Sequence, residues 1–120
     1  MPDLLERART MRLYTMDAWV ADPAVLTKEA ELRAALHAGA AVGGATVLGE
    51  EFCVFPNGAV TGVLVLAQSH LCIHTWPELA LANVDLLSYG NVSGEDVLAE
   101  VGVRLSVVRA SVTCVPRALG

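Results

Sequence analysis

The fold class is decided by three strand-like runs within residues 45–76, ATVLGEEFCVFPNGAVTGVLVLAQSHLCIHTW. The first run covers residues 45–55, the second residues 59–67 and the third residues 70–76. The group Pro56-Asn57-Gly58 between the first two runs is a turn signal. These two runs are therefore predicted to pair as a hairpin, and the third is predicted to be a further strand.

A strand and a helix are predicted on the N-terminal side of this region. Apolar and polar residues alternate over residues 11–21, which is typical of a strand. Asp22 followed by Pro23 is typical of a helix start, because the carboxylate caps the helix and proline suits its first turn. Helical spacing of apolar residues follows, and Gly39 is expected to end the helix. Residues 1–10 are expected to be a short polar lead, without the apolar stretch of a signal peptide.

The C-terminal side adds a strand, a helix and a last strand. Residues 81–89 are predicted to form a strand, and residues 104–115 are rich in β-forming residues. Ser93 followed by Asp96 resembles a helix cap, with the helix expected to run to about Val101. The resulting order, β-α-β-β-β-β-α-β, predicts one α+β domain over residues 1–120. It is expected to be a two-layer sandwich of a mainly antiparallel sheet with helices on one face.

The composition limits the possible partners. The formal net charge is -5, so the chain has no general attraction for nucleic acid, although it suits a cationic small molecule. Hydrophobic residues make up 54% of the chain, yet no apolar run approaches the ~20 residues of a membrane helix. The excess indicates a face buried in a homodimer or larger assembly; the alternative is a core rich in alanine, valine and leucine. Three unpaired cysteines and no export signal predict reduced thiols and a cytoplasmic location.

Candidate chemistry is concentrated in residues 69–78, SHLCIHTWPE, which hold a serine, two of the three histidines, a cysteine and a glutamate. One interpretation is a core strand with incidental polar residues. A second is a metal site, because His70, Cys72 and His74 share one strand face and Cys53 is available as a further thiol. A third is nucleophilic chemistry by Ser69 with a histidine partner.

This segment resembles the processing segment of the prokaryotic S-adenosylmethionine decarboxylase family. The resemblance covers most of the chain and includes FPNGAVTG at residues 55–62, the strand Val84-Asp85-Leu86 and the break at Gly90. It implies a proenzyme in which the Ser69 hydroxyl attacks the carbonyl of Gln68 and forms an ester. Elimination would leave dehydroalanine, which rearranges to a pyruvoyl cofactor. The products would be a β chain of residues 1–68 and an α chain of residues 69–120.

The resemblance also implies roles for other residues. Thr61 would supply a hydroxyl for processing and His74 would accept a proton, while the pyruvoyl group would form a Schiff base with the substrate. Phe55 and His74 would flank a flat group such as adenine, and Glu78 would bind ribose or a cationic group. On a regular strand Ser69 and His74 point to opposite faces, so either the strand bends or His74 reaches across the turn.

One position departs from the family pattern. The run Asp85-Leu86-Leu87-Ser88-Tyr89-Gly90 has tyrosine where the family has its catalytic cysteine, the usual proton donor to the substrate. A phenol can donate a proton, but it is a weaker acid than a thiol and is larger. Three hypotheses follow: an S-adenosylmethionine decarboxylase with Tyr89 as donor, the same chemistry on L-ornithine or L-arginine, or a non-catalytic paralogue that regulates an active copy.

Overall fold

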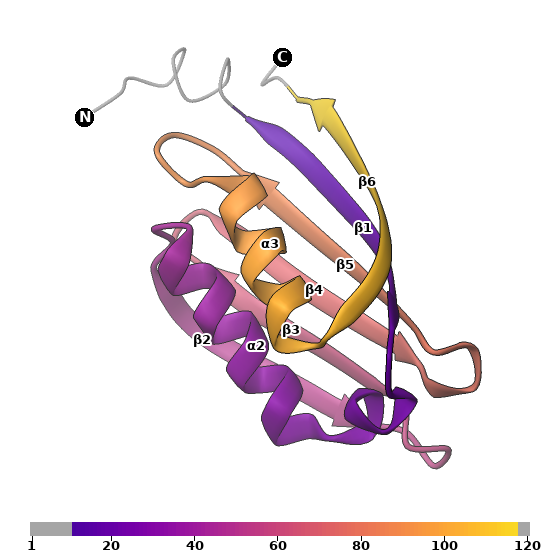
Figure 1. The fold of residues 1–120 in the computed structure, drawn as a ribbon. Helices are drawn as coiled ribbons and strands as arrows, with labels where there is room; N and C mark the ends of the chain where they lie inside the picture. The colour runs from indigo at the N-terminus through magenta and orange to yellow at the C-terminus, as the bar shows by residue number, and fades with distance from the viewer. Residues whose placement is uncertain (1–10, 118–120) are drawn as a thin grey trace.

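The computed structural model describes residues 11–117 and arranges them in two layers, a sheet and a pair of helices (Figure 1). The sheet has six strands: β1 (Arg12–Val20), β2 (Val47–Val54), β3 (Val60–Leu66), β4 (Ser69–Trp76), β5 (Leu81–Ser88) and β6 (Val107–Pro116). Their order in the sheet is β2-β3-β4-β5-β1-β6, and every neighbouring pair is antiparallel. The predicted α+β sandwich and its order of elements are confirmed.

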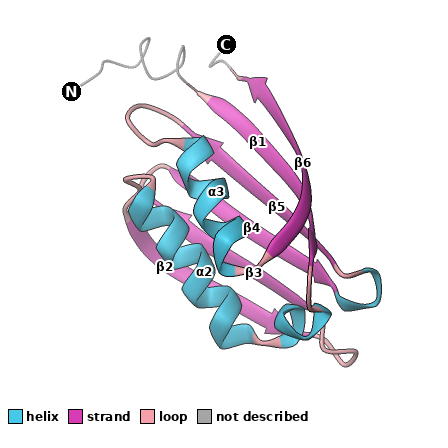
Figure 2. Ribbon diagram, viewed as in Figure 1, coloured by secondary structure: helices cyan, strands magenta, loops and turns pink. Residues whose placement is uncertain are grey.

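Both long helices, α2 (Glu29–Val42) and α3 (Gly94–Arg104), lie on the same face of the sheet, as Figure 2 shows. Two short 3-10 helices, η1 (Pro23–Thr27) and η2 (Pro77–Leu79), follow the ends of β1 and β4. The core between the layers is apolar, and its largest fully buried side chains include Leu32, Leu36, Leu64, Leu71, Ile73, Leu86, Val97 and Val101. Within residues 11–117 no helix is long and apolar enough to cross a membrane.

Helix boundaries differ from the expectation in the first helical region. Asp22 does cap a helix, and its side chain accepts a hydrogen bond from the backbone N–H of Ala24 (3.0 Å), but this helix is the short η1. The backbone is extended at Lys28, and α2 begins only at Glu29. The prediction that Gly39 ends the helix is wrong, because α2 continues to Val42 and is capped by Gly43.

Other boundaries agree more closely. Ser93 caps α3 as predicted, and its hydroxyl accepts a hydrogen bond from the backbone N–H of Asp96 (3.3 Å). The helix extends beyond Val101 to Arg104. The polar lead expected at residues 1–10 lies outside the described residues.

Gly39 is required by the contact between the helices rather than by helix termination. A Cβ atom at Gly39 would lie 2.8 Å from Cγ2 of Val101 and 2.9 Å from the backbone oxygen of Val97. The second contact is with backbone, so relief requires α3 to shift. Gly39 therefore allows α2 and α3 to pack closely.

Gly39→Ala is expected to destabilise the fold despite the higher helix propensity of alanine. Overpacking typically costs about 1–3 kcal/mol, against a propensity gain of about 1 kcal/mol, so the midpoint of thermal unfolding should fall by several degrees. Gly102→Ala on α3 is the matched control, since its Cβ would meet nothing closer than 3.9 Å. That variant should be neutral or slightly stabilised. Equal midpoints for the two variants would contradict the close-packing role.

Candidate active site

Strand β4 divides the chemical motif between two faces of the sheet. By the alternation of side chains along the strand, Ser69 belongs to the same face as Leu71, Ile73 and Thr75, which are buried under the helices. His74 lies on the opposite, open face together with His70, Cys72 and Trp76. The strand pairs with β3 from Ser69 to His74 and with β5 from Leu71 to Trp76, so it does not turn back on itself. Ser69 and His74 of one chain are therefore about 16 Å apart along the strand and on opposite faces.

Ser69 stands at the first position of β4, directly after a two-residue turn. Leu66 of β3 pairs with Ser69, so Ala67 and Gln68 form the turn. Gln68 has a backbone φ of 60°, in the left-handed region that a non-glycine residue seldom adopts. The Ser69 hydroxyl donates a hydrogen bond to the backbone oxygen of Leu87 on β5. The predicted nucleophile and the predicted cleavage point thus share a constrained turn.

Tyr89 comes to the same place. Its hydroxyl donates a hydrogen bond to the backbone oxygen of Ala67 (2.6 Å). Ser69, Gln68 and Tyr89 all line one cavity of about 560 Å³. The remaining lining comes from β3, the β3–β4 turn, the end of β5 and two loops: Gly44, Ala45, Thr46, Leu66, Ala67, Leu87, Gly90, Asn91 and Val92. The structure therefore brings together three of the residues singled out in the sequence.

Thr61 and His74 form a second group on the open face. Thr61 is the register partner of His74, and its Oγ1 lies 2.6 Å from Nδ1 of His74. The ring of Phe55 is 6.1 Å from that of His74 and tilted by 58°, while Trp76 packs edge-on against His74 at 4.4 Å. Glu78 lies in η2, four residues beyond His74, and is exposed. This group combines an aromatic surface with a paired hydroxyl and imidazole, but it does not include Ser69.

Trp76 and its partners were not assigned a role from the sequence. The indole N–H of Trp76 donates to Oδ1 of Asn83 (2.6 Å), and the Asn83 amide donates to Oδ1 of Asp17 (2.8 Å). The period of two along β4 would have placed Trp76 beside His74. Asn83 and Asp17 could not be found in that way, because they belong to strands whose register is not visible in local sequence.

The metal interpretation has no support in the described residues. His70, Cys72 and His74 do share a strand face, but residues 11–117 contain no group of three or more suitable side chains that could hold a metal ion. Cys53 lies on β2, which is separated from β4 by β3. All three cysteines are free thiols, and burial, followed by the charge of Asp85, raises the pKa of Cys72.

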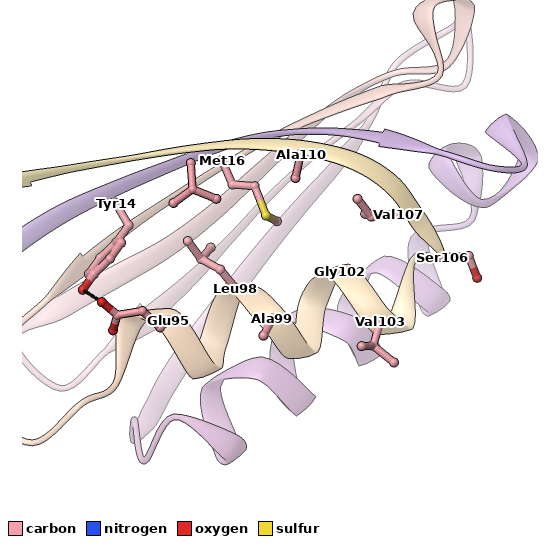
Figure 3. A pocket seen from close by; sticks show the side chains of 11 residues that line it. Tyr14, Met16, Glu95, Leu98, Ala99, Gly102, Val103, Ser106, Val107 and Ala110 are labelled. Carbon is pink, nitrogen blue, oxygen red and sulfur yellow. Dashed lines mark hydrogen bonds between the residues drawn. The ribbon is translucent and has the colours of Figure 1, made fainter.

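A larger cavity, of about 710 Å³, lies between α3 and strands β1 and β6 (Figure 3). Its lining is mostly apolar, with a hydrogen bond from the Tyr14 hydroxyl to Oε1 of Glu95 (2.7 Å) at one end. Burial, followed by this hydrogen bond, raises the pKa of Tyr14, while the bond lowers the pKa of Glu95. None of the residues predicted for catalysis lines this cavity. Size therefore does not identify the site here, and the smaller cavity beside Ser69 is the better candidate.

The fold resembles that of a solved enzyme. The crystal structure of the adenosylmethionine decarboxylase from Aquifex aeolicus VF5 superposes with a TM-score of 0.80 over 93% of each chain, at 22% sequence identity. At this identity the similarity concerns the fold alone.

Sequence comparison identifies relatives named S-adenosylmethionine decarboxylase proenzyme. The relative from Methanococcus aeolicus is 36% identical over 87 residues, which cover 72% of this chain and 74% of the relative. The relative from Hydrogenobaculum sp. is 38% identical, and the matched segment covers 72% of this chain and 65% of the relative. The relative from Symbiobacterium thermophilum is 49% identical, and there the match covers 49% of this chain and 45% of the relative. The chain thus spans between about half and two thirds of the length of several curated relatives. A sequence model described as S-adenosylmethionine decarboxylase matches residues 12–118, and the chain therefore belongs to this family.

Proposed function

We propose that the chain is a self-processing proenzyme whose mature form decarboxylates S-adenosylmethionine. The names of its relatives support this assignment. The observation that carries it is the position of Ser69, at the exit of a turn with a left-handed residue and with its hydroxyl oriented by the Leu87 carbonyl. A hydroxyl next to a constrained peptide bond, at the edge of a cavity, suits an attack on that bond.

Processing begins with an attack by Oγ of Ser69 on the carbonyl carbon of Gln68. The new C–O bond forms as the Gln68–Ser69 amide bond breaks, and the hydroxyl proton passes to the Ser69 nitrogen. A base then removes the Cα proton of Ser69 while the Gln68 carboxylate leaves from Cβ, which gives dehydroalanine. Tautomerisation and hydrolysis, with loss of ammonia, give a pyruvoyl group at residue 69. The fragments are residues 1–68 and 69–120.

The base and the processing hydroxyl are supplied by a second copy of the chain. His74 and Thr61 form a hydrogen-bonded pair, but they lie on the opposite face of the sheet from Ser69 of the same chain. A site built between two protomers removes this conflict at the end of the sheet, where Ser69 begins β4 and borders a cavity that a partner can reach past the strand ends. Ser69 and Tyr89 of one protomer then face the partner's Thr61 and the partner's His74. Neither protomer has a complete site alone.

The open face of the sheet supports such a dimer. No described helix covers this face, yet it carries large apolar side chains as well as polar ones. Phe55, Val65, Trp76 and Val115 expose between 40% and 49% of their surfaces there. Burial of apolar surface favours association, so covering this face with a second sheet would stabilise the pair.

The surroundings of Ser69 fit a pyruvoyl group, because residue 69 borders the cavity rather than packed core. Such a group would supply the electron-accepting carbonyl that decarboxylation of an amino acid requires. Tyr89 lines the same cavity, where its hydroxyl would donate a proton to the substrate carbon after carbon dioxide leaves. Tyr89 thus takes the place of the thiol donor usual in the family.

The partner's open face, which completes the site in the proposed dimer, suits the rest of the substrate. S-adenosylmethionine carries a purine and a sulfonium cation, and aromatic rings stack on purines and attract cations. Phe55, His74 and Trp76 gather there, and the exposed Glu78 adds a carboxylate nearby in the chain. Because the rings of Phe55 and His74 are tilted by 58°, the purine would stack on one of them rather than between parallel walls.

The substrate is tested by measuring carbon dioxide release from carboxyl-labelled S-adenosylmethionine, L-ornithine and L-arginine in parallel. We expect S-adenosylmethionine to react about a hundredfold faster or more, because a site that binds its polar groups rejects substrates that leave these groups unpaired. Ser69→Ala is the inactive control. Carbon dioxide release only from ornithine or arginine would show that a basic amino acid, and not S-adenosylmethionine, is the substrate. A cleaved protein that releases none from any of the three would favour the hypothesis of a regulatory paralogue.

A further inference from the structure

The turn before Ser69 is held through both backbone polar groups of Ala67, which belong to two successive peptide units. The backbone N–H of Ala67 donates to the oxygen of Thr46 (2.9 Å), and the Ala67 oxygen accepts from the Tyr89 hydroxyl (2.6 Å). Thr46 belongs to the loop after α2, and Tyr89 directly follows β5. Ala67, which directly precedes Gln68, is therefore fixed by two distant segments.

This contact bears on the conformation of Gln68. The Ala67 oxygen belongs to the peptide group whose orientation defines φ of Gln68, and that angle is 60°. A left-handed conformation is unfavourable for a non-glycine residue. A hydrogen bond to the adjoining peptide group can offset part of this cost, and the Tyr89 phenol supplies one.

The end of β5 thus contacts groups on both sides of the Gln68–Ser69 bond, the Ala67 carbonyl before it and the Ser69 hydroxyl after it. Leu87 accepts the hydrogen bond from the Ser69 hydroxyl, and Tyr89, two residues later, donates to the Ala67 carbonyl. Leu71 of β4 pairs with Leu86 of β5 in antiparallel register. Three residues back from Leu71 and three residues on from Leu86, the same register places Gln68 opposite Tyr89. A side chain at this position is therefore suited to act on the turn.

We propose that Tyr89 is a positioning residue for self-cleavage, whose hydroxyl holds the Ala67–Gln68 peptide group in the conformation from which Ser69 attacks. This inference rests on the proposed self-processing and adds to it a role for Tyr89 before any substrate binds. A cysteine at this position, with its short side chain, could not span the same distance. The tyrosine is therefore part of how this particular chain processes itself.

The test is a time course of self-cleavage after cell-free synthesis, followed by intact mass. Tyr89→Phe keeps the ring and removes the hydroxyl, so cleavage should slow by roughly three- to tenfold, the equivalent of one hydrogen bond. Tyr14→Phe is the matched control, because it also removes a phenol that donates a hydrogen bond, but at the other cavity. Its cleavage rate should equal that of the wild type.

Rescue separates positioning from a general structural role. Glycine adopts a positive φ without steric cost, so Gln68→Gly added to Tyr89→Phe should return the rate towards that of the wild type. A Tyr89→Phe protein that cleaves at the wild-type rate, or one that is slowed but not rescued by Gln68→Gly, would overturn the inference. A wild-type chain that stays intact would instead overturn the proposed self-processing.

A second pair of variants applies if Tyr89→Phe does not fold. Valine disfavours a positive φ strongly, whereas asparagine tolerates it. Gln68→Val should therefore cleave several-fold more slowly than Gln68→Asn. Equal rates for this pair would show that the turn conformation does not govern cleavage, and the inference would fall.

Discussion

Ser69→Ala is expected to leave the chain intact, while the wild type separates into residues 1–68 and 69–120. Alanine has no nucleophile for the Gln68 carbonyl, so cleavage should be lost entirely rather than slowed. Electrophoresis and intact mass of the purified proteins give the result directly. The fragment that starts at residue 69 should also resist N-terminal sequencing, because a pyruvoyl group has no amine.

Ser88→Ala provides the control for this result. Its hydroxyl also donates to a backbone oxygen, that of Val92 (2.9 Å), so the substitution removes a similar hydrogen bond close to the same cavity. This variant should still cleave. Cleavage of Ser69→Ala at the same bond, or loss of cleavage in both variants, would count against Ser69 as the nucleophile.

The second large effect is complementation between two inactive variants. Ser69→Ala lacks the nucleophile, and His74→Ala lacks the base, whose loss should slow processing by about a hundred- to ten-thousand-fold. In a mixed dimer, Ser69 of the His74→Ala chain meets the intact His74 of the other protomer. That chain should then cleave, and with equal amounts and random pairing about half of it should do so.

Co-expression of the two variants with tags of different length identifies the cleaved chain. The matched control pairs His74→Ala with the double variant Ser69→Ala/His74→Ala, which supplies neither group and should leave both chains intact. No cleavage in the first mixture, despite mixed dimers seen by pull-down, would show that the site does not form between protomers. A protein that is monomeric in light scattering at micromolar concentration would contradict the dimer itself.

Local sequence determined most of the fold. Alternation identified the strands, the group Pro56-Asn57-Gly58 identified the β2–β3 hairpin, and Ser93 with Asp96 identified the start of α3. These features depend on residues within a few positions of one another, so a period or a cap can reveal them. The prediction for Gly39 is wrong because the role of this residue depends on Val97 and Val101, which lie on another helix.

For the site, alternation along residues 69–76 placed Ser69 and His74 on opposite faces of a regular strand but left open whether the strand bends. The resemblance to the family singled out Ser69, Thr61 and Tyr89. Only the tertiary structure decided that β4 stays regular, because hydrogen bonding to both β3 and β5 holds it so. Only the tertiary structure brought the Tyr89 hydroxyl to the Ala67 carbonyl, 22 residues away in the chain. Strand register and helix packing depend on which side chains become buried across the whole core, and a short stretch of sequence does not reveal this.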